Sequence, residues 1–220
     1  AERRREPNEG ANQELPPGTR GIMFRLTALF SMDALGGGFM VNGFISFWFT
    51  TRFGVSLETI AGIFFAGQIL NSISLALATP LARKIGLIAT MAYTQGVSNI
   101  LMILMALTGN LWFAVGFFML RELSNEMDVP TRQSYSMAIV PPEARTAMAG
   151  MTNLGRTFAQ TVSPGMAGLV AQTTFLGAPM IAGSIIKLVY NAALLMTFRS
   201  IKAPEEEARA KQQASQPDPS

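Results

Sequence analysis

Hydrophobic residues fall into six long, nearly continuous runs between residues 23 and 198. Each run contains about 20 residues or more, enough for an α-helix to cross a bilayer core roughly 30 Å thick. Continuous runs exclude a membrane β-barrel, whose strands alternate apolar and polar residues. The pattern therefore predicts an all-α integral membrane protein with six transmembrane helices. We place these helices at residues 23–49, 58–79, 86–107, 110–130, 146–171 and 176–198.

Polar segments flank the hydrophobic region. Residues 1–20 contain charged residues, Pro, Gly and Asn with almost no large apolar side chains, and residues 201–220 finish in a Gln-, Ser- and Pro-rich stretch. Such compositions bury too little surface to fold. We therefore predict a disordered cytoplasmic linker at 1–20, a transmembrane bundle at 21–200 and a disordered cytoplasmic tail at 201–220. Because the chain begins with Ala1 and shows no signal-peptide core, we expect a fragment of a longer protein.

Composition changes the picture mainly by exclusion. The chain is 49% hydrophobic and 14% charged, whereas soluble proteins contain about 25% charged residues. It has no Cys and no His, which excludes disulfides, thiolate catalysis, and the commonest general base and metal ligand. We expect no metal and no cofactor. The basic residues lie in loops and form no patch, so nucleic acid is not an expected partner.

Lys and Arg residues in the predicted loops gather on one side of the membrane, and Arg52 stands alone on the other side. Cytoplasmic loops are enriched in these residues. Both termini are therefore predicted to be cytoplasmic at an inner or plasma membrane, which requires an even number of spans. The residues on the cytoplasmic side are Arg3, Arg4, Arg5, Arg20, Arg83, Lys84, Arg132, Arg145, Arg199, Lys202, Arg209 and Lys211.

Charged and amide side chains also occur inside the predicted spans. A charge at the centre of an isolated spanning helix costs about 2.5–3.5 kcal/mol, so such side chains face partners or a water-filled cavity. We predict that a substrate and proton pathway is lined by Asp33, Asn42, Gln68, Asn71, Arg121, Glu122, Asn125 and Gln160. We predict a neighbouring charge network of Glu126, Asp128, Arg156 and Lys187.

Two interpretations of these charges are open. In one, they are ion pairs that only tie the helices together. In the other, Asp33 and Glu122 exchange protons during transport, and Arg121 pairs with them or meets an anionic substrate. The glycines at residues 36–38 either pack helices closely or break a spanning helix, as transporters do at their sites. Asp33 and Arg121 lie at matching depths in oppositely directed spans, as a three-plus-three inverted repeat would place them.

Several segments resemble the C-terminal six-helix half of a major facilitator superfamily transporter, and the likeness covers nearly the whole chain. Residues 80–86 resemble the second copy of the family's loop motif, roughly Leu-Ala-Asp-Arg-x-Gly, so Arg83, Lys84 and Gly86 would form a cytoplasmic gate loop. Arg83 stands where the motif has its Asp, a departure at the residue that the family associates with gating. Residues 127–133 and 140–145 resemble the loop before the fifth helix of that half. Residues 163–168 resemble the family's small-residue, proline-containing segment that follows this loop.

The resemblance implies a fold and a function. The fold would be half of a 12-helix bundle, with the first and fourth spans along the central pathway and the second and fifth facing the N-terminal half. The function would be secondary active transport of a small-molecule substrate by alternating access, coupled to protons, without enzymatic activity. The partners would be the lipid bilayer and an N-terminal six-helix half. The alternatives are a half-size chain that assembles as a homodimeric transporter or channel, and an intramembrane aspartyl-type enzyme. Substrate and direction of transport are open.

Overall fold

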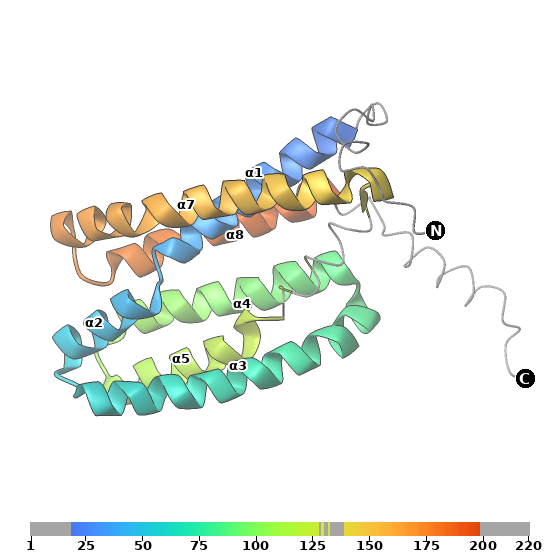
Figure 1. Cartoon of the computed structure of the whole chain (residues 1–220). Helices are drawn as coiled ribbons and strands as arrows, with labels where there is room; N and C mark the ends of the chain where they lie inside the picture. Colours follow the sequence, from blue (N-terminus) through green and yellow to red (C-terminus); the bar gives the residue numbers. More distant parts are fainter. Residues whose placement is uncertain (1–18, 128, 130–131, 133–138, 199–220) are drawn as a thin grey trace, which may run out of the picture.

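The computed structural model describes residues 19–127, 129, 132 and 139–198, and its regular structure is entirely helical (Figure 1). The predicted tails at 1–20 and 201–220 therefore lie almost wholly outside the described residues, as does Asp128. The helices are α1 (Thr19–Gly38), α2 (Asn42–Phe53), α3 (Leu57–Ile85), α4 (Leu87–Leu107), α5 (Leu111–Asn125), the 3-10 helix η1 (Pro142–Ala144), α7 (Arg145–Thr173) and α8 (Ala178–Phe198).

The first predicted span is a broken helix. α1 ends at Gly38, and α2 begins at Asn42 after Val41, whose backbone is extended (φ −64°, ψ 146°). The glycines at the end of α1 weaken its last turn, because Gly costs about 1 kcal/mol relative to Ala in a helix interior. The break interrupts a segment of 35 residues that is otherwise long and apolar enough to span a membrane.

The turn predicted at residues 80–86 is shorter in the structure. α3 continues through Pro80 to Ile85, so Gly86 alone separates it from α4. Gly86 has a φ of +88°, a conformation that glycine adopts without the penalty of a side chain. The fourth predicted span, at 110–130, is also shorter, since α5 ends at Asn125. Asn110 caps the start of α5 by accepting a hydrogen bond from the Trp112 backbone at 2.9 Å.

Four segments are long and apolar enough to cross a bilayer: Thr19–Phe53, Leu57–Ile85, Ile88–Leu107 and Ala178–Thr197. α5 has only 15 residues, and α7 is long but more polar. An all-α membrane protein is thus supported, whereas the six spans and the inverted repeat stay predictions.

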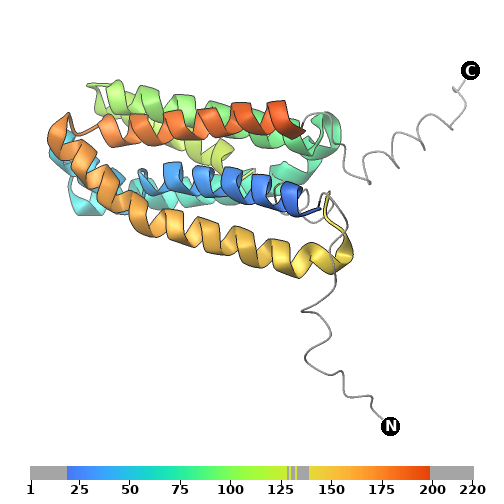
Figure 2. The same cartoon turned by 90° about the horizontal axis from the view of Figure 1, so that it is seen from above.

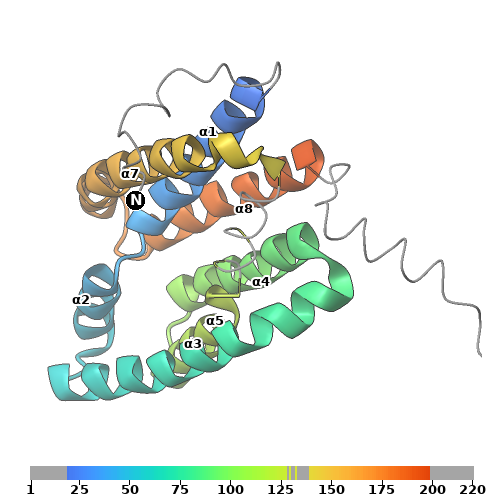
Figure 3. The same cartoon turned by 45° about the vertical axis from the view of Figure 1, so that its right-hand side comes forward.

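The helices form two groups that run along a common direction (Figures 1 and 3). α1 lies between α7 and α8 (Figure 2) and packs most extensively on α7. α3, α4 and α5 form the second group, and α4 joins the two by packing on α8. The start of α1, the α3–α4 turn, η1 and the end of α8 lie at one end of the bundle (Figure 1). Arg20, Arg83, Lys84 and Arg145 belong to that end, and Arg52 in the last turn of α2 belongs to the other.

Candidate functional site

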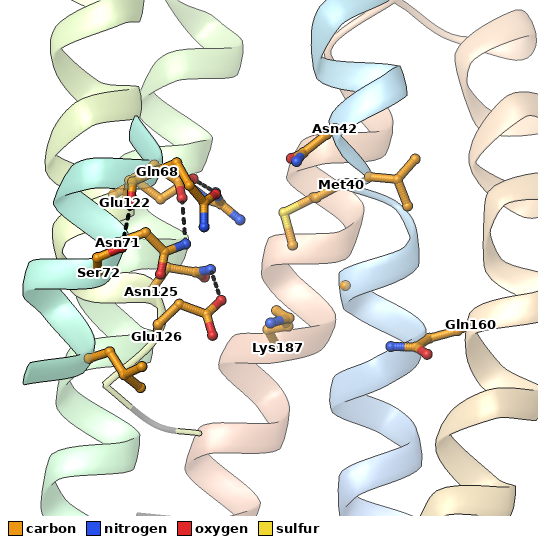
Figure 4. Close-up of a pocket in the computed structure, with 14 residues that line it drawn as sticks. Met40, Asn42, Gln68, Asn71, Ser72, Glu122, Asn125, Glu126, Gln160 and Lys187 are labelled. Atoms are coloured by element: carbon orange, nitrogen blue, oxygen red, sulfur yellow. Dashed lines mark hydrogen bonds and ion pairs between the residues drawn. The ribbon is translucent and has the colours of Figure 1, made fainter. Parts of the chain in front are cut away.

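A polar cavity of about 570 Å³ lies between the two helix groups, beside the break in the first span (Figure 4). Its walls come from the break and from α3, α5, α7 and α8, so segments far apart in the sequence meet there. The lining residues are Gly37, Met40, Val41, Asn42, Gln68, Asn71, Ser72, Leu75, Arg121, Glu122, Asn125, Glu126, Gln160 and Lys187.

One wall carries a neutralised ion pair on α5. The Arg121 guanidinium donates to the Glu122 carboxylate, and both side chains are largely buried. Asn71 on α3 donates to the other Glu122 oxygen at 3.1 Å. Gly67 lets α3 approach this pair, because a Cβ added there would lie 3.2 Å from Glu122 Cγ. The pair is therefore held by contacts between α3 and α5.

Glu126 lies one turn further along the same wall. Asn125 donates to its carboxylate at 3.1 Å and in turn accepts from Ser98 of α4 at 3.4 Å. Within the part of the chain that the structure describes, no Lys or Arg nitrogen lies within 4 Å of the Glu126 carboxylate. Among the described residues, the Asn125 amide is thus the side-chain partner of the Glu126 carboxylate, and no cation neutralises its charge.

The opposite wall presents the ammonium of Lys187 on α8 (Figure 4). Its Nζ lies 3.2 Å from Asp33 Oδ1 on α1. α1 and α8 approach closely here, since a Cβ on Gly36 would lie 2.8 Å from both the Gly183 carbonyl and Lys187 Cγ. Two glycines therefore set the separation that brings Lys187 to Asp33.

Asp33 lies behind this wall and does not line the cavity. It is only 4% exposed, and three side chains hold its carboxylate, namely Lys187, Arg132 and Gln95. Arg132 Nη1 lies 2.7 Å from Oδ2, and Gln95 Nε2 of α4 donates to Oδ1 at 2.8 Å. The Arg132 guanidinium also lies over the Phe30 ring, 5.5 Å from its centre. The cavity and this buried cluster share Lys187, which contacts both.

The structure gathers most of the residues predicted for the pathway. The cavity is lined by Asn42, Gln68, Asn71, Arg121, Glu122, Asn125 and Gln160, with Glu126 and Lys187 from the predicted network. Asp33 stands apart, one contact behind Lys187. Arg156 is half-buried on α7 and is not a lining residue. Arg83 and Lys84 are exposed in the last turn of α3, beside Gly86 at the end of the bundle.

Arg132 was predicted among the charges of the cytoplasmic side, and that assignment stays a prediction. Its side chain is buried, 6% exposed, because the Asp33 carboxylate needs a cation. Gln95 was missed altogether. A signal was present in the sequence, since Gln95, Ser98 and Asn99 are three and four residues apart in an otherwise apolar helix and so share one face.

Comparison with known proteins gives one informative relative. The chain is 29% identical over 198 residues to an uncharacterized membrane protein of Saccharomyces cerevisiae, a match that covers 90% of this chain. The chain spans 44% of the length of that relative. No family model matches the chain. This chain is a membrane protein. Its similarity to part of a longer membrane protein agrees with the apolar helices and carries no assignment of activity.

Proposed function

We propose that this chain is part of a secondary active transporter that moves a small solute by alternating access, and that it corresponds to the C-terminal half of a protein similar to the major facilitator superfamily. The observation that carries the proposal is the polar cavity between the two helix groups. Four charged side chains line it, namely Arg121, Glu122, Glu126 and Lys187. Four isolated charges at bilayer depth would cost on the order of 10 kcal/mol. A water-filled route through the membrane would remove most of this cost.

The broken first span supports the same function. Interrupted helices leave backbone groups available beside a site within the membrane, and such backbone is tolerated only where it lines a cavity or is covered by protein. The break at residues 39–41 contributes Met40 and Val41 to the cavity wall.

A second half would complete the cavity. α3 is the least buried of the four candidate spans, and Gln68 and Ser72 on α3 and Gln160 on α7 are exposed while they line the cavity. Polar side chains exposed on membrane helices call for a protein neighbour. The yeast relative, of which this chain spans 44%, is long enough to contain another bundle of similar size.

Proton coupling would use the carboxylates that are paired with cations. Asp33 contacts two basic side chains from other parts of the chain, Lys187 on α8 and Arg132. Glu122 contacts Arg121, its neighbour on α5. Asp33→Asn or Glu122→Gln in the full-length protein is expected to abolish uphill transport while exchange of substrate across the membrane persists. Normal uphill transport by both variants would refute the coupling role. The proposal assigns no enzymatic activity, since Asp33 and Glu122 are held by separate partners and do not form a facing pair.

Alternating access is testable before the substrate is known, because this chain contains no Cys. Single cysteines at Asn42, Gln68 and Gln160 are introduced into an otherwise cysteine-free full-length protein in sealed, oriented membrane vesicles. A membrane-impermeant thiol reagent is then added from either side. The proposal expects each cysteine to react from both sides, because the cavity opens to each compartment in turn.

Matched controls define the outcome. A cysteine at Arg52, at one end of the bundle, is expected to react from one side only. A cysteine at Phe65, an exposed apolar position on α3, is expected to resist the reagent. If the cavity positions react from one side only, or resist the reagent from both, the cavity does not alternate and the proposed function is wrong.

A further inference from the structure

The two walls of the cavity carry opposite charges, and no ion pair or hydrogen bond between described residues connects Lys187 with Glu126. Figure 4 shows Lys187 on one side, and Glu122 and Glu126 with their amide partners on the other. The Arg121–Glu122 pair is already neutral. The charges that face the cavity beyond this pair are therefore one ammonium, on Lys187, and one carboxylate, on Glu126.

Lys187 is able to exchange partners at low cost. Asp33, its only carboxylate neighbour within 4 Å among the described residues, also holds Arg132 at 2.7 Å and Gln95 at 2.8 Å. If Lys187 turns towards a ligand, Asp33 keeps a cation on one oxygen and an amide donor on the other. Because the buried carboxylate is never left unpaired, the usual penalty for breaking a buried ion pair is avoided.

Glu126 complements this arrangement. Its carboxylate has the Asn125 amide as its hydrogen-bond donor in the described structure and no basic partner within 4 Å. A carboxylate accepts more than one hydrogen bond, so it retains capacity for a cationic group. The rest of the lining is rich in amides, from Asn42, Gln68 and Gln160, which both donate and accept hydrogen bonds.

We propose that the cavity binds a small zwitterionic solute, of the amino acid or short peptide class, with its anionic group on Lys187 and its cationic group near Glu126. The inference rests on the proposed function, since it names the class of solute that is moved. A purely anionic solute would contact Lys187 but place negative charge beside the Glu126 carboxylate. A purely cationic solute would contact Glu126 but place positive charge beside the Lys187 ammonium. An apolar solute would bury the amides without partners.

The test measures binding to the full-length protein in detergent. The probes are the common L-amino acids and simple dipeptides, scored by the rise in melting temperature that a ligand specific for the folded state produces. Each probe that binds is then compared with its N-acetylated form, which keeps only the anion, and its C-terminal amide, which keeps only the cation. We expect each single-charge form to bind at least about tenfold more weakly than the parent, as the loss of one charged contact predicts.

Two variants assign the charges. Lys187→Gln should remove the preference for the parent over its amide form, and Glu126→Gln should remove the preference over its acetylated form. Matched controls are Arg52→Gln and Glu58→Gln, which neutralise exposed charges at the far end of the bundle. A change in selectivity separates binding from folding, because a merely destabilised protein loses affinity for all three forms together.

The inference is overturned if no zwitterion raises the melting temperature, if the single-charge forms bind as well as the parent, or if both variants keep the wild-type selectivity. Failure here is distinguishable from failure of the proposed function. If the cavity cysteines react from both sides but no zwitterion binds, the proposed solute class is wrong and the proposed function stands. If a zwitterion binds but the cysteines react from one side only, the cavity is a zwitterion-binding site and the proposed transport function is wrong.

Discussion

The contact between Asp33 and Lys187 permits a test in which one substitution should change the sign of its effect. Asp33→Asn keeps the size of the side chain but removes its charge, which leaves Lys187 without a carboxylate among the described residues. Removing one partner of a buried ion pair leaves the other charge uncompensated, which lowers the free energy of unfolding by about 3–5 kcal/mol. Lys187→Met in the wild-type background should cost less, about 1.5–3 kcal/mol, the range for a hydrogen bond to a charged group. Asp33 then still holds Arg132 and Gln95.

In the Asp33→Asn background the same Lys187→Met change removes a stranded cation. The double variant is therefore expected to be more stable than Asp33→Asn alone, and the coupling energy should exceed about 1 kcal/mol. The assay is the free energy of unfolding of the full-length protein in mixed micelles, measured by titration with a denaturing detergent for the wild type, both single variants and the double variant. Arg52→Gln serves as a control, because it neutralises an exposed charge at the other end of the bundle. If Lys187→Met has the same effect in both backgrounds within about 0.5 kcal/mol, the two side chains act independently, and the described ion pair does not exist.

Three further outcomes are expected. Gly183→Ala should destabilise the protein by about 1–3 kcal/mol in the same assay, because the new Cβ would lie 2.6 Å from the Gly36 carbonyl. Gly150→Ala is the control, because nothing lies within 4 Å of its Cβ. Equal effects of the two substitutions would contradict the close approach of α1 and α8. Ser163→Ala should remain within about 1 kcal/mol of the wild type or exceed it, because the buried hydroxyl has no hydrogen-bond partner in the described structure; a larger loss would reveal a bond to the hydroxyl. Residues 1–220 alone in liposomes should move no solute, because the proposed cavity needs a second bundle; measurable uptake by this chain would refute that requirement.

Much of the candidate site was predictable from local sequence. An amide or charged residue in an apolar run has to face protein or water, whatever the rest of the fold is. This rule alone selects Asn42, Gln68, Glu122 and Gln160, which the structure brings to one cavity. The same rule groups Asp33 with these residues, although Asp33 lies behind the cavity wall. Local composition shows that a polar residue avoids lipid, but it does not show which of its possible protein neighbours the residue contacts.

The pairings were not predictable in this way. Arg132 lies 99 residues from Asp33 along the chain, and Gln95 lies 62 residues away. Positive charge near a predicted helix end indicates topology on average, but it does not indicate which carboxylate Arg132 contacts. An unpaired charge in the membrane interior costs several kcal/mol, so the burial of Asp33 and Arg132 depends on a contact that no local pattern encodes.

Hydrophobic patterning by itself determined the class of the protein, the approximate helix positions and the places where polarity is expensive, because burial in a bilayer depends on each segment's own composition. Only the tertiary structure decided that the first span is broken beside a cavity, that Lys187 serves both the cavity and Asp33, and that Glu126 faces it across that space. Those features depend on how helices rotate and approach one another. Here contacts such as that between Gly36 and Gly183 fix the approach, and no run of neighbouring residues encodes them.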